Sequence, residues 1–304
     1  MAPSPSRERS VTVQSILYGT ELGALERTLE ALDTSAALAR RDGLGDGLRV
    51  VLGDASPHRL VSDEVLAGYR SRFGELESLD YLFFGENTGT AKGHNTMARL
   101  TDSAYLVTSN PDIVPDARAL WRMLDLFEDP STGMVEAKQL PVEHPKEYDV
   151  ATGETGWAAT AFAMTPRDLF DELGGFDEQT FFMYCDDVDY SWLVREAGRV
   201  VRFQPAALAF HDKRLSLTGA WQPTSAETFY SAQAALLLAH KWSREDVVER
   251  VLADFGRSTI PEYADAVAEF ERRRDAGLLV AQHDPEHRVG YFTDGYYTKH
   301  RYAL

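Results

Sequence analysis

The chain has 304 residues, 44% of them hydrophobic, which is enough to bury the core of one large domain with or without an appendage. Its 31 basic and 48 acidic residues give a formal net charge of −17, which argues against nucleic acid or an anionic membrane surface as the partner. The single cysteine, Cys185, excludes an internal disulfide and fits a reducing cytoplasm. Residues 1–10 resemble no signal peptide, and no apolar run is long enough to span a bilayer. We therefore expect a soluble, cytoplasmic protein with a disordered start at residues 1–10.

Strand-like and helix-like patterns alternate through the first half of the chain. Residues 11–18 alternate apolar and polar side chains, which predicts a strand, and residues 21–39 repeat leucine at helical spacing. The further expected elements are a strand at 48–52, a helix at 62–73, a strand at 81–84, a small-residue loop at 86–95 opening a helix at 96–100, and a strand at 104–108. This alternation predicts an α/β fold with a doubly wound, mostly parallel sheet.

The second half changes character twice. Residues 134–140 predict a strand, residues 141–155 a long excursion, and residues 166–173 a helix stopped by two glycines. After His211 the patterns predict three helices, at 226–242, 243–255 and 260–276, the second capped by Ser243 with Asp246 at its third position. The tail from residue 283 is rich in aromatic side chains. It would either close over a bound ligand or pack the last helices onto the core.

One acidic cluster, Asn110-Pro111-Asp112, directly follows a predicted strand. Asp112 should therefore stand at the carboxyl edge of the sheet, where open α/β folds bind ligands. Asn-Pro-Asp is also common turn chemistry, so the motif alone is a weak signal. A carboxylate here would suit Mg²⁺ or Mn²⁺, and His211 is either a packed histidine or a second metal ligand.

The second cluster places Asp186, Asp187 and Asp189 between aromatic residues. Carboxylates crowded against aromatic surface should have raised or split pKa values, as a general base requires. Helical spacing puts Asp186 and Asp189 on one face and turns Asp187 away. Dinucleotide, P-loop, serine-elbow and zinc-finger spacings are all missing from the sequence.

As a set, these motifs resemble family 2 glycosyltransferases of the GT-A fold, particularly the bacterial rhamnosyltransferase-like branch. The resemblance covers about residues 11–214 and follows the family's order through six further motifs: Asp54-Ala55-Ser56, Glu86-Asn87-Thr88-Gly89 with Gly93-His94-Asn95, Asn110-Pro111-Asp112, Gly174-Gly175-Phe176-Asp177-Glu178, Phe181-Phe182-Met183-Tyr184 with Asp186-Asp187-Val188-Asp189, and the segment ending in His211.

The resemblance implies a role for each matched residue. Asp112 would be the last acid of the metal-binding D-x-D element, His211 would join the metal or the diphosphate, and Asp187 would be the catalytic base beside Asp186. The nucleotide-sugar site would be lined by Tyr18, Asp54, Asn87, Lys92, Asn95, Asn110 and Trp157. The fold implied is a mixed, mostly parallel GT-A sheet with helices on both faces, spanning residues 11–214, followed by a C-terminal helical extension and aromatic tail at 215–304.

The function implied is inverting, Mg²⁺- or Mn²⁺-dependent transfer of a sugar from a nucleoside diphosphate donor. The donor would be dTDP-rhamnose or a UDP-sugar, and the acceptor a hydroxyl of a saccharide, a cell-surface glycan or a natural product. Peripheral attachment to the inner face of the membrane and pairing of two copies through residues 226–242 are further options. The rival interpretation is a non-catalytic nucleotide-sugar or glycan-binding protein of the same fold.

Three departures from the family pattern bear on these roles. Gly53 stands where relatives place a base-reading Asp, which displaces Asp54 by one position and puts the nucleobase in doubt. Asn110 replaces the first acid of D-x-D, which leaves less charge for a metal. Leu193 stands where relatives often place Arg.

Overall fold

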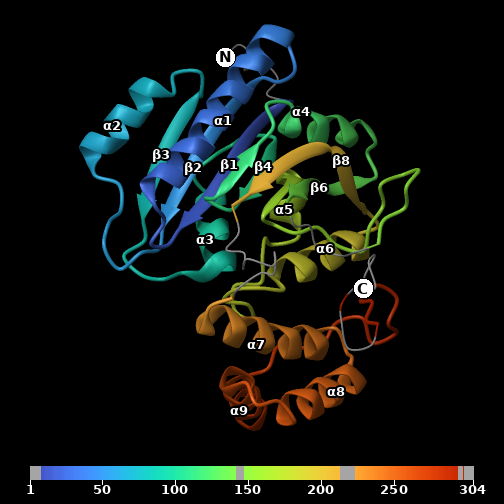
Figure 1. Ribbon diagram of the computed structural model, residues 1–304. Coiled ribbons are helices and arrows are strands. Elements are labelled where there is room, and N and C mark those ends of the chain that lie inside the picture. Colours follow the sequence, from blue (N-terminus) through green and yellow to red (C-terminus); the bar gives the residue numbers. More distant parts are fainter. Residues whose placement is uncertain (1–7, 142–146, 213–222, 294–296, 298–304) are drawn as a thin grey trace.

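The computed structural model describes residues 8–141, 147–212, 223–293 and 297. Within these residues, eight strands form one sheet in the order β3-β2-β1-β4-β7-β6-β8-β5 (Figure 1). The strands are β1 (Ser10–Leu17), β2 (Gly47–Asp54), β3 (Ser78–Phe83), β4 (Tyr105–Ser109), β5 (Ile113–Pro115), β6 (Thr132–Leu140), β7 (Phe162–Pro166) and β8 (Val200–His211).

Most strands of the sheet run in one direction. β1 is parallel to β2 and β4, β2 to β3, and β6 to β8. β7 lies antiparallel between β4 and β6, and β5 is antiparallel to β8. The carboxyl ends of β1, β2, β4, β6 and β8 therefore meet at one edge of the sheet, which is where Asn110 and His211 lie.

Helices cover both faces of the sheet, as the sequence predicts. Adjacent residues of one strand point to opposite faces, and Val107 and Leu106 of β4 belong to different hydrophobic clusters. The Val107 cluster includes residues from α1 (Leu22–Asp42), α2 (Asp63–Arg72) and α4 (Ala119–Leu124), the last continued by a 3₁₀ turn at Asp125–Glu128. The Leu106 cluster includes residues from α3 (Gly89–Ala98), α5 (Arg167–Glu172) and α6 (Asp186–Glu196).

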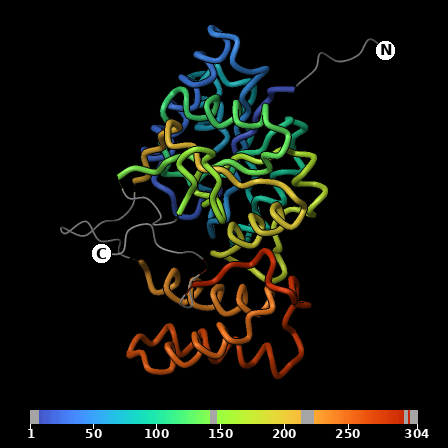
Figure 2. The backbone as a smooth tube through the Cα atoms, turned by 90° about the vertical axis from the view of Figure 1, so that its right-hand side faces the viewer, coloured from blue at the N-terminus to red at the C-terminus, as the bar shows by residue number. Residues whose placement is uncertain are grey.

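The C-terminal extension consists of α7 (Ser225–Lys241), α8 (Glu245–Gly256) and α9 (Pro261–Asp275). In Figures 1 and 2 these helices lie below the sheet, with α6 between them and the strands. They share a third hydrophobic cluster with α6, in which Val188 and Trp192 pack with Trp242 and Phe270. The extension is therefore packed against the helix that carries the acidic motif. Among the described residues, no helix is both long and apolar enough to cross a membrane.

The expected elements are found, with two corrections. The small-residue segment predicted as a loop up to residue 95 is helical from Gly89 onward. Gly89 itself has a φ of 65° and lies so close to the carbonyl of Phe182 that a Cβ would collide with it. The predicted Ser243 cap of α8 is wrong, because α8 begins after Arg244 and the Ser243 hydroxyl donates to the carbonyl of His283.

Candidate active site

The first acidic cluster brings Asn110, Asp112 and His211 together. Strand register does this, because His211 at the end of β8 is paired with Ile113 of β5, directly after Asp112. The His211 Nε2 atom lies 3.4 Å from Asp112 Oδ1 and 3.3 Å from Asn110 Nδ2. The Asp112 side chain remains 33% exposed, so this group faces solvent from the carboxyl edge of the sheet.

A glutamine fixes the orientation of the histidine ring. Gln139 on β6 is 1% exposed, and its Oε1 lies 2.9 Å from His211 Nδ1. Because an amide oxygen can only accept, Nδ1 is the donor to Gln139. In the neutral imidazole with this tautomer, the lone pair of Nε2 lies on the side of Asn110 and Asp112. A second partner that fixes the tautomer in this way is a common companion of metal-binding histidines.

The donor set of this cluster suits a divalent cation. A nitrogen lone pair and a carboxylate oxygen repel one another at 3.4 Å unless a proton or cation lies between them. Imidazole with a hard carboxylate oxygen fits Mn²⁺ or Mg²⁺, the remaining positions being filled by water and phosphate. The described part of the chain has no group of three or more His, Cys, Asp or Glu residues arranged to hold a metal. Protein ligands alone would hold the ion weakly.

The second acidic cluster forms the first turn of α6. Two non-glycine residues with left-handed backbone, Tyr184 (φ 68°) and Cys185 (φ 56°), lead into it, an arrangement that costs energy and is concentrated at functional sites. The carboxylates of Asp186, Asp187 and Asp189 lie at the positive end of the helix dipole.

Asp186 and Asp187 differ in their surroundings, as helical spacing predicts. Asp186 is 3% exposed and accepts a hydrogen bond from Thr90 Oγ1 at 2.6 Å. Burial, together with the neighbouring charge of Asp187, raises the pKa of Asp186 to about 7. Asp187 is only partly buried, and its Oδ1 accepts from the backbone N–H of Val188. Asp187 is thus the member of the pair that remains accessible.

Asp189, the third acid of this turn, bonds to residues at the end of α7. It is fully buried, and its two oxygens accept from Lys241 Nζ at 2.8 Å and Trp242 Nε1 at 2.9 Å. Both oxygens of its carboxylate therefore bond to the C-terminal extension.

The residues expected around the nucleotide fall into two groups. Tyr18 directly follows β1 and is 57% exposed, which leaves its ring accessible to a ligand. Lys92 on α3 is also accessible and pairs with Glu86 at 2.6 Å, and Asn87 accepts from the N–H of Gly89. Asp54, by contrast, is fully buried and accepts from the backbone N–H groups of Ser56 and Leu60 and from the Tyr81 hydroxyl.

The structure explains why position 53 is glycine. A Cβ there would lie 2.6 Å from the ring of Phe84 and 2.8 Å from the sulfur of Met97. An Asp at this position could not be accommodated without moving both side chains. Asp54 holds its loop in shape through three internal hydrogen bonds, so its predicted contact with a nucleobase stays a prediction.

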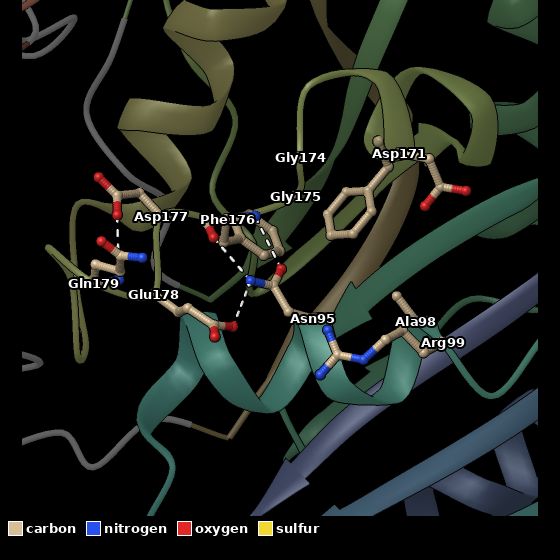
Figure 3. A pocket seen from close by; sticks show the side chains of 11 residues that line it. Asn95, Ala98, Arg99, Asp171, Gly174, Gly175, Phe176, Asp177, Glu178 and Gln179 are labelled. Atoms are coloured by element: carbon tan, nitrogen blue, oxygen red, sulfur yellow. Dashed lines mark hydrogen bonds between the residues drawn. The ribbon is translucent and has the colours of Figure 1, made fainter.

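Asn95 organises the glycine-rich segment that precedes the acidic turn. Its Nδ2 donates to the Phe176 carbonyl and to Glu178 Oε2, both at 2.8 Å, and its Oδ1 accepts from the Phe176 N–H. Figure 3 shows these bonds beside a cavity of about 510 Å³ between α3 and residues 174–179. The cavity is lined by none of the proposed metal-binding or catalytic residues Asp112, Asp186, Asp187 and His211. It is therefore no evidence for a donor-binding site.

Trp157 lies in the core shared by α6 and the extension. It is 3% exposed and makes an edge-to-face contact with Tyr297, with ring centroids 5.4 Å apart. Phe292 packs edge-to-face against Trp192 at 5.2 Å. These contacts favour packing over a lid for the described part of the tail, while residues 294–296 and 298–304 lie outside the described residues.

Three residues of the site were missed from the sequence: Thr90, Gln139 and Lys241. Each lies far along the chain from the group that it contacts, by 96, 72 and 52 residues respectively. No local spacing signals such pairs. The unusual placement of a lysine in the apolar run of residues 232–242 was the one visible hint.

Comparisons with known proteins bear on the fold of the chain and on the class of protein that it resembles. No protein-family model matches the chain. The pre-mycofactocin glycosyltransferase of Mycobacterium tuberculosis (strain H37Rv) is 26% identical over 212 residues, covering 63% of this chain and 42% of the relative. The rhamnosyltransferase WbbL of Escherichia coli K12 is 26% identical over 207 residues, covering 55% of this chain and 78% of that relative. Over more than half of its length the chain is therefore similar to curated glycosyltransferases, one of them a rhamnosyltransferase.

Solved structures show the same fold. GalNAc-T7 with UDP, GalNAc and Mn²⁺ superposes with a TM-score of 0.64 at 13% identity, covering 92% of this chain and 56% of that chain. The expected mixed, mostly parallel GT-A sheet with C-terminal helices is thereby confirmed. The chain spans less than half the length of the pre-mycofactocin glycosyltransferase that it matches.

Proposed function

We propose that this glycosyltransferase-like chain transfers a sugar from a nucleoside diphosphate donor to a hydroxyl group, with inversion at the anomeric carbon and with Mg²⁺ or Mn²⁺ as cofactor. The observation that carries the proposal is the pair formed by Asp112 and His211, whose Oδ1 and Nε2 atoms lie 3.4 Å apart at the carboxyl edge of a GT-A sheet. Such an edge is where α/β folds bind nucleotides.

Asp112 and His211 would hold the cation, and Asn110 would contribute its amide to the same group. When bound, the cation would neutralise charge on the departing nucleoside diphosphate. Lys213 and Arg214, two cations that follow His211 in the sequence and could also pair with a diphosphate, lie outside the described residues.

Asp187 would take the proton from the acceptor hydroxyl. Its partial exposure allows an acceptor to reach it, while Asp186, held by Thr90 and with a raised pKa, would share the negative charge of the pair. The oxygen deprotonated by Asp187 would attack the face of the sugar opposite the diphosphate. Displacement from that face inverts the anomeric centre.

The donor is proposed from the relatives. The similarity to the rhamnosyltransferase WbbL favours dTDP-rhamnose, and UDP in the similar GalNAc-T7 structure keeps UDP-sugars as the next choice. The exposed ring of Tyr18 at the end of β1 would stack on the base. The acceptor would be a saccharide, cell-surface glycan or natural-product hydroxyl, and the catalytic domain would end near residue 214.

The alternative is a nucleotide-sugar-binding protein that does not turn over. Two observations favour it: the carboxylate of Asp54 is consumed by internal hydrogen bonds, and Asn110 stands in place of an acid. The deciding experiment measures release of nucleoside diphosphate from dTDP-rhamnose and UDP-sugars with Mn²⁺, with and without saccharide acceptors. A donor that raises the melting temperature while no diphosphate is released would support the alternative and contradict the proposed transfer.

A further inference from the structure

A buried lysine from the extension contacts two acidic residues of the catalytic domain. Lys241, at the end of α7, is 3% exposed. Its Nζ lies 2.8 Å from Asp177 Oδ2 and 2.8 Å from Asp189 Oδ2. Trp242 donates to the other oxygen of Asp189 at 2.9 Å. A single ammonium group therefore joins two carboxylates that are twelve positions apart in the sequence.

The two carboxylates stand at the two ends of the segment that carries the proposed base. Residues 178–188 lie between them and include Asp186 and Asp187. At the first end, the other oxygen of Asp177 accepts from the N–H groups of Gln179 and Thr180. At the second end, Asp189 belongs to the first turn of α6. Lys241 thus closes this segment into a loop whose ends are fixed at one point.

The loop needs such support because its backbone is strained. Tyr184 and Cys185 both have positive φ values, directly before Asp186 and Asp187. Side chains disfavour this conformation, which persists only where the surrounding structure over-determines it. Several contacts hold the loop, and the Lys241 pair is the one that joins its two ends. Between the ends, Thr90 on α3 bonds to the Phe182 carbonyl and to Asp186, and Asn95 donates to Glu178.

We propose that Lys241 is a positioning residue for the proposed base, holding both ends of residues 177–189 so that Asp187 meets the acceptor hydroxyl in a productive orientation. The extension then belongs to the catalytic unit and is more than an attached domain. Lys241 touches neither donor nor acceptor in this role. The kinetic part of the proposal rests on the proposed function, but the structural part does not.

The first test uses hydrogen exchange and needs no substrate. Lys241→Met leaves the buried Asp189 without its cation, so the double variant Asp189→Asn with Lys241→Met is added, since it removes that buried negative charge as well. The partly exposed Asp177 keeps its carboxylate in both variants. Val248→Ala on α8 serves as the control, because Val248 is 1% exposed in the same core but lies outside the loop. In both Lys241 variants we expect amide exchange in residues 178–188 to accelerate about tenfold or more, and in Val248→Ala to stay unchanged there.

The second test is kinetic. Each variant is assayed at the same interval below its own melting temperature. Under this condition kcat for transfer should fall about tenfold or more in the Lys241 variants relative to Val248→Ala, because a base displaced from its productive geometry lowers the rate. Binding of UDP and dTDP with Mn²⁺ should stay within about twofold of wild type, since the metal end is untouched. Lys241→Arg should recover part of the loss.

The outcomes separate the two proposals. If wild-type protein transfers no sugar, the proposed function fails, and the exchange experiment alone decides the role of Lys241. Unchanged exchange in residues 178–188, or acceleration equal to that of Val248→Ala, would overturn the positioning role. A kcat that merely follows stability in all variants would overturn it as well.

Discussion

The two acidic regions of the site are built on opposite principles. At the sheet edge, Asp112 is one-third exposed and lies beside the Nε2 atom of His211, so its carboxylate can be reached by a ligand. On α6, Asp186 and Asp189 are buried and held by a hydroxyl and an ammonium respectively. A ligand-binding carboxylate must keep its bonding capacity open, whereas a base must be held still and have its proton affinity tuned by neighbours.

This contrast predicts that removing the charge of Asp187 should have the largest effect on turnover. Asp187→Asn keeps the size of the side chain but cannot accept the acceptor proton, so transfer should fall about 100-fold or more while the fold is retained. Initial rates with saturating donor and Mn²⁺ measure the effect. Asp254→Asn, an exposed change on α8, is the control and should leave the rate unaltered. Near-normal transfer by Asp187→Asn would move the base to Asp186.

The sheet-edge region should respond as a binding site. Asp112→Ala is expected to weaken Mn²⁺ and nucleoside diphosphate binding together, because one ion would contact both, and His211→Ala should show a milder form of the same coupling. Calorimetry with UDP or dTDP, with and without Mn²⁺, measures it. Asp116→Ala, on an exposed acid paired with Arg122 nearby, is the matched control. Full activity in excess chelator would contradict the metal assignment.

A smaller effect on Mn²⁺ affinity is expected from changing Gln139, the residue that bonds to His211 Nδ1. Gln139→Met removes the acceptor of the His211 Nδ1 proton and should weaken Mn²⁺ about tenfold, the low end for the loss of a partner that orients a metal-binding histidine. Gln204 lies on β8, the strand next to β6, and Gln204→Met loses a hydrogen bond to the Arg122 carbonyl of α4, so this variant controls for packing. Manganese titration followed by electron paramagnetic resonance gives the affinity. Equal values for the two variants would show that Gln139 does not orient the ring.

Sequence reasoning recovered the order of elements and the two acidic regions because both depend on local pattern. Hydrophobic alternation placed β1 and β2, and the acids of α6 followed from helical spacing. The antiparallel insertion of β7 was not predicted, since strand direction depends on contacts distant in sequence. The same limit hid Gln139 and Lys241, whose roles exist only after β8 and α7 have packed against their partners.

The smallest expected effect is a pH dependence of stability that separates Asp186 from its neighbours. Its folded pKa of about 7 lies above the ordinary value for aspartate, so at intermediate pH the folded state binds a proton that the unfolded state lacks. This stabilisation is fully present below about pH 4 and is lost as the pH rises through about 7. Each unit of difference between the folded and unfolded pKa corresponds to about 1.4 kcal/mol in the free energy of unfolding.

Asp186→Asn mimics the protonated acid, so the variant should not lose this stability as the pH rises. The melting temperature of the variant should therefore gain on wild type by a few degrees between about pH 5 and pH 8. Asp80→Asn, an exposed acid on β3, should give a curve parallel to wild type. If the Asp186→Asn curve is also parallel, the carboxyl is already ionised in the folded protein at pH 5. Asp186 and Asp187 would then both be charged, and the division of roles between an accessible base and a proton-holding neighbour would have to be abandoned.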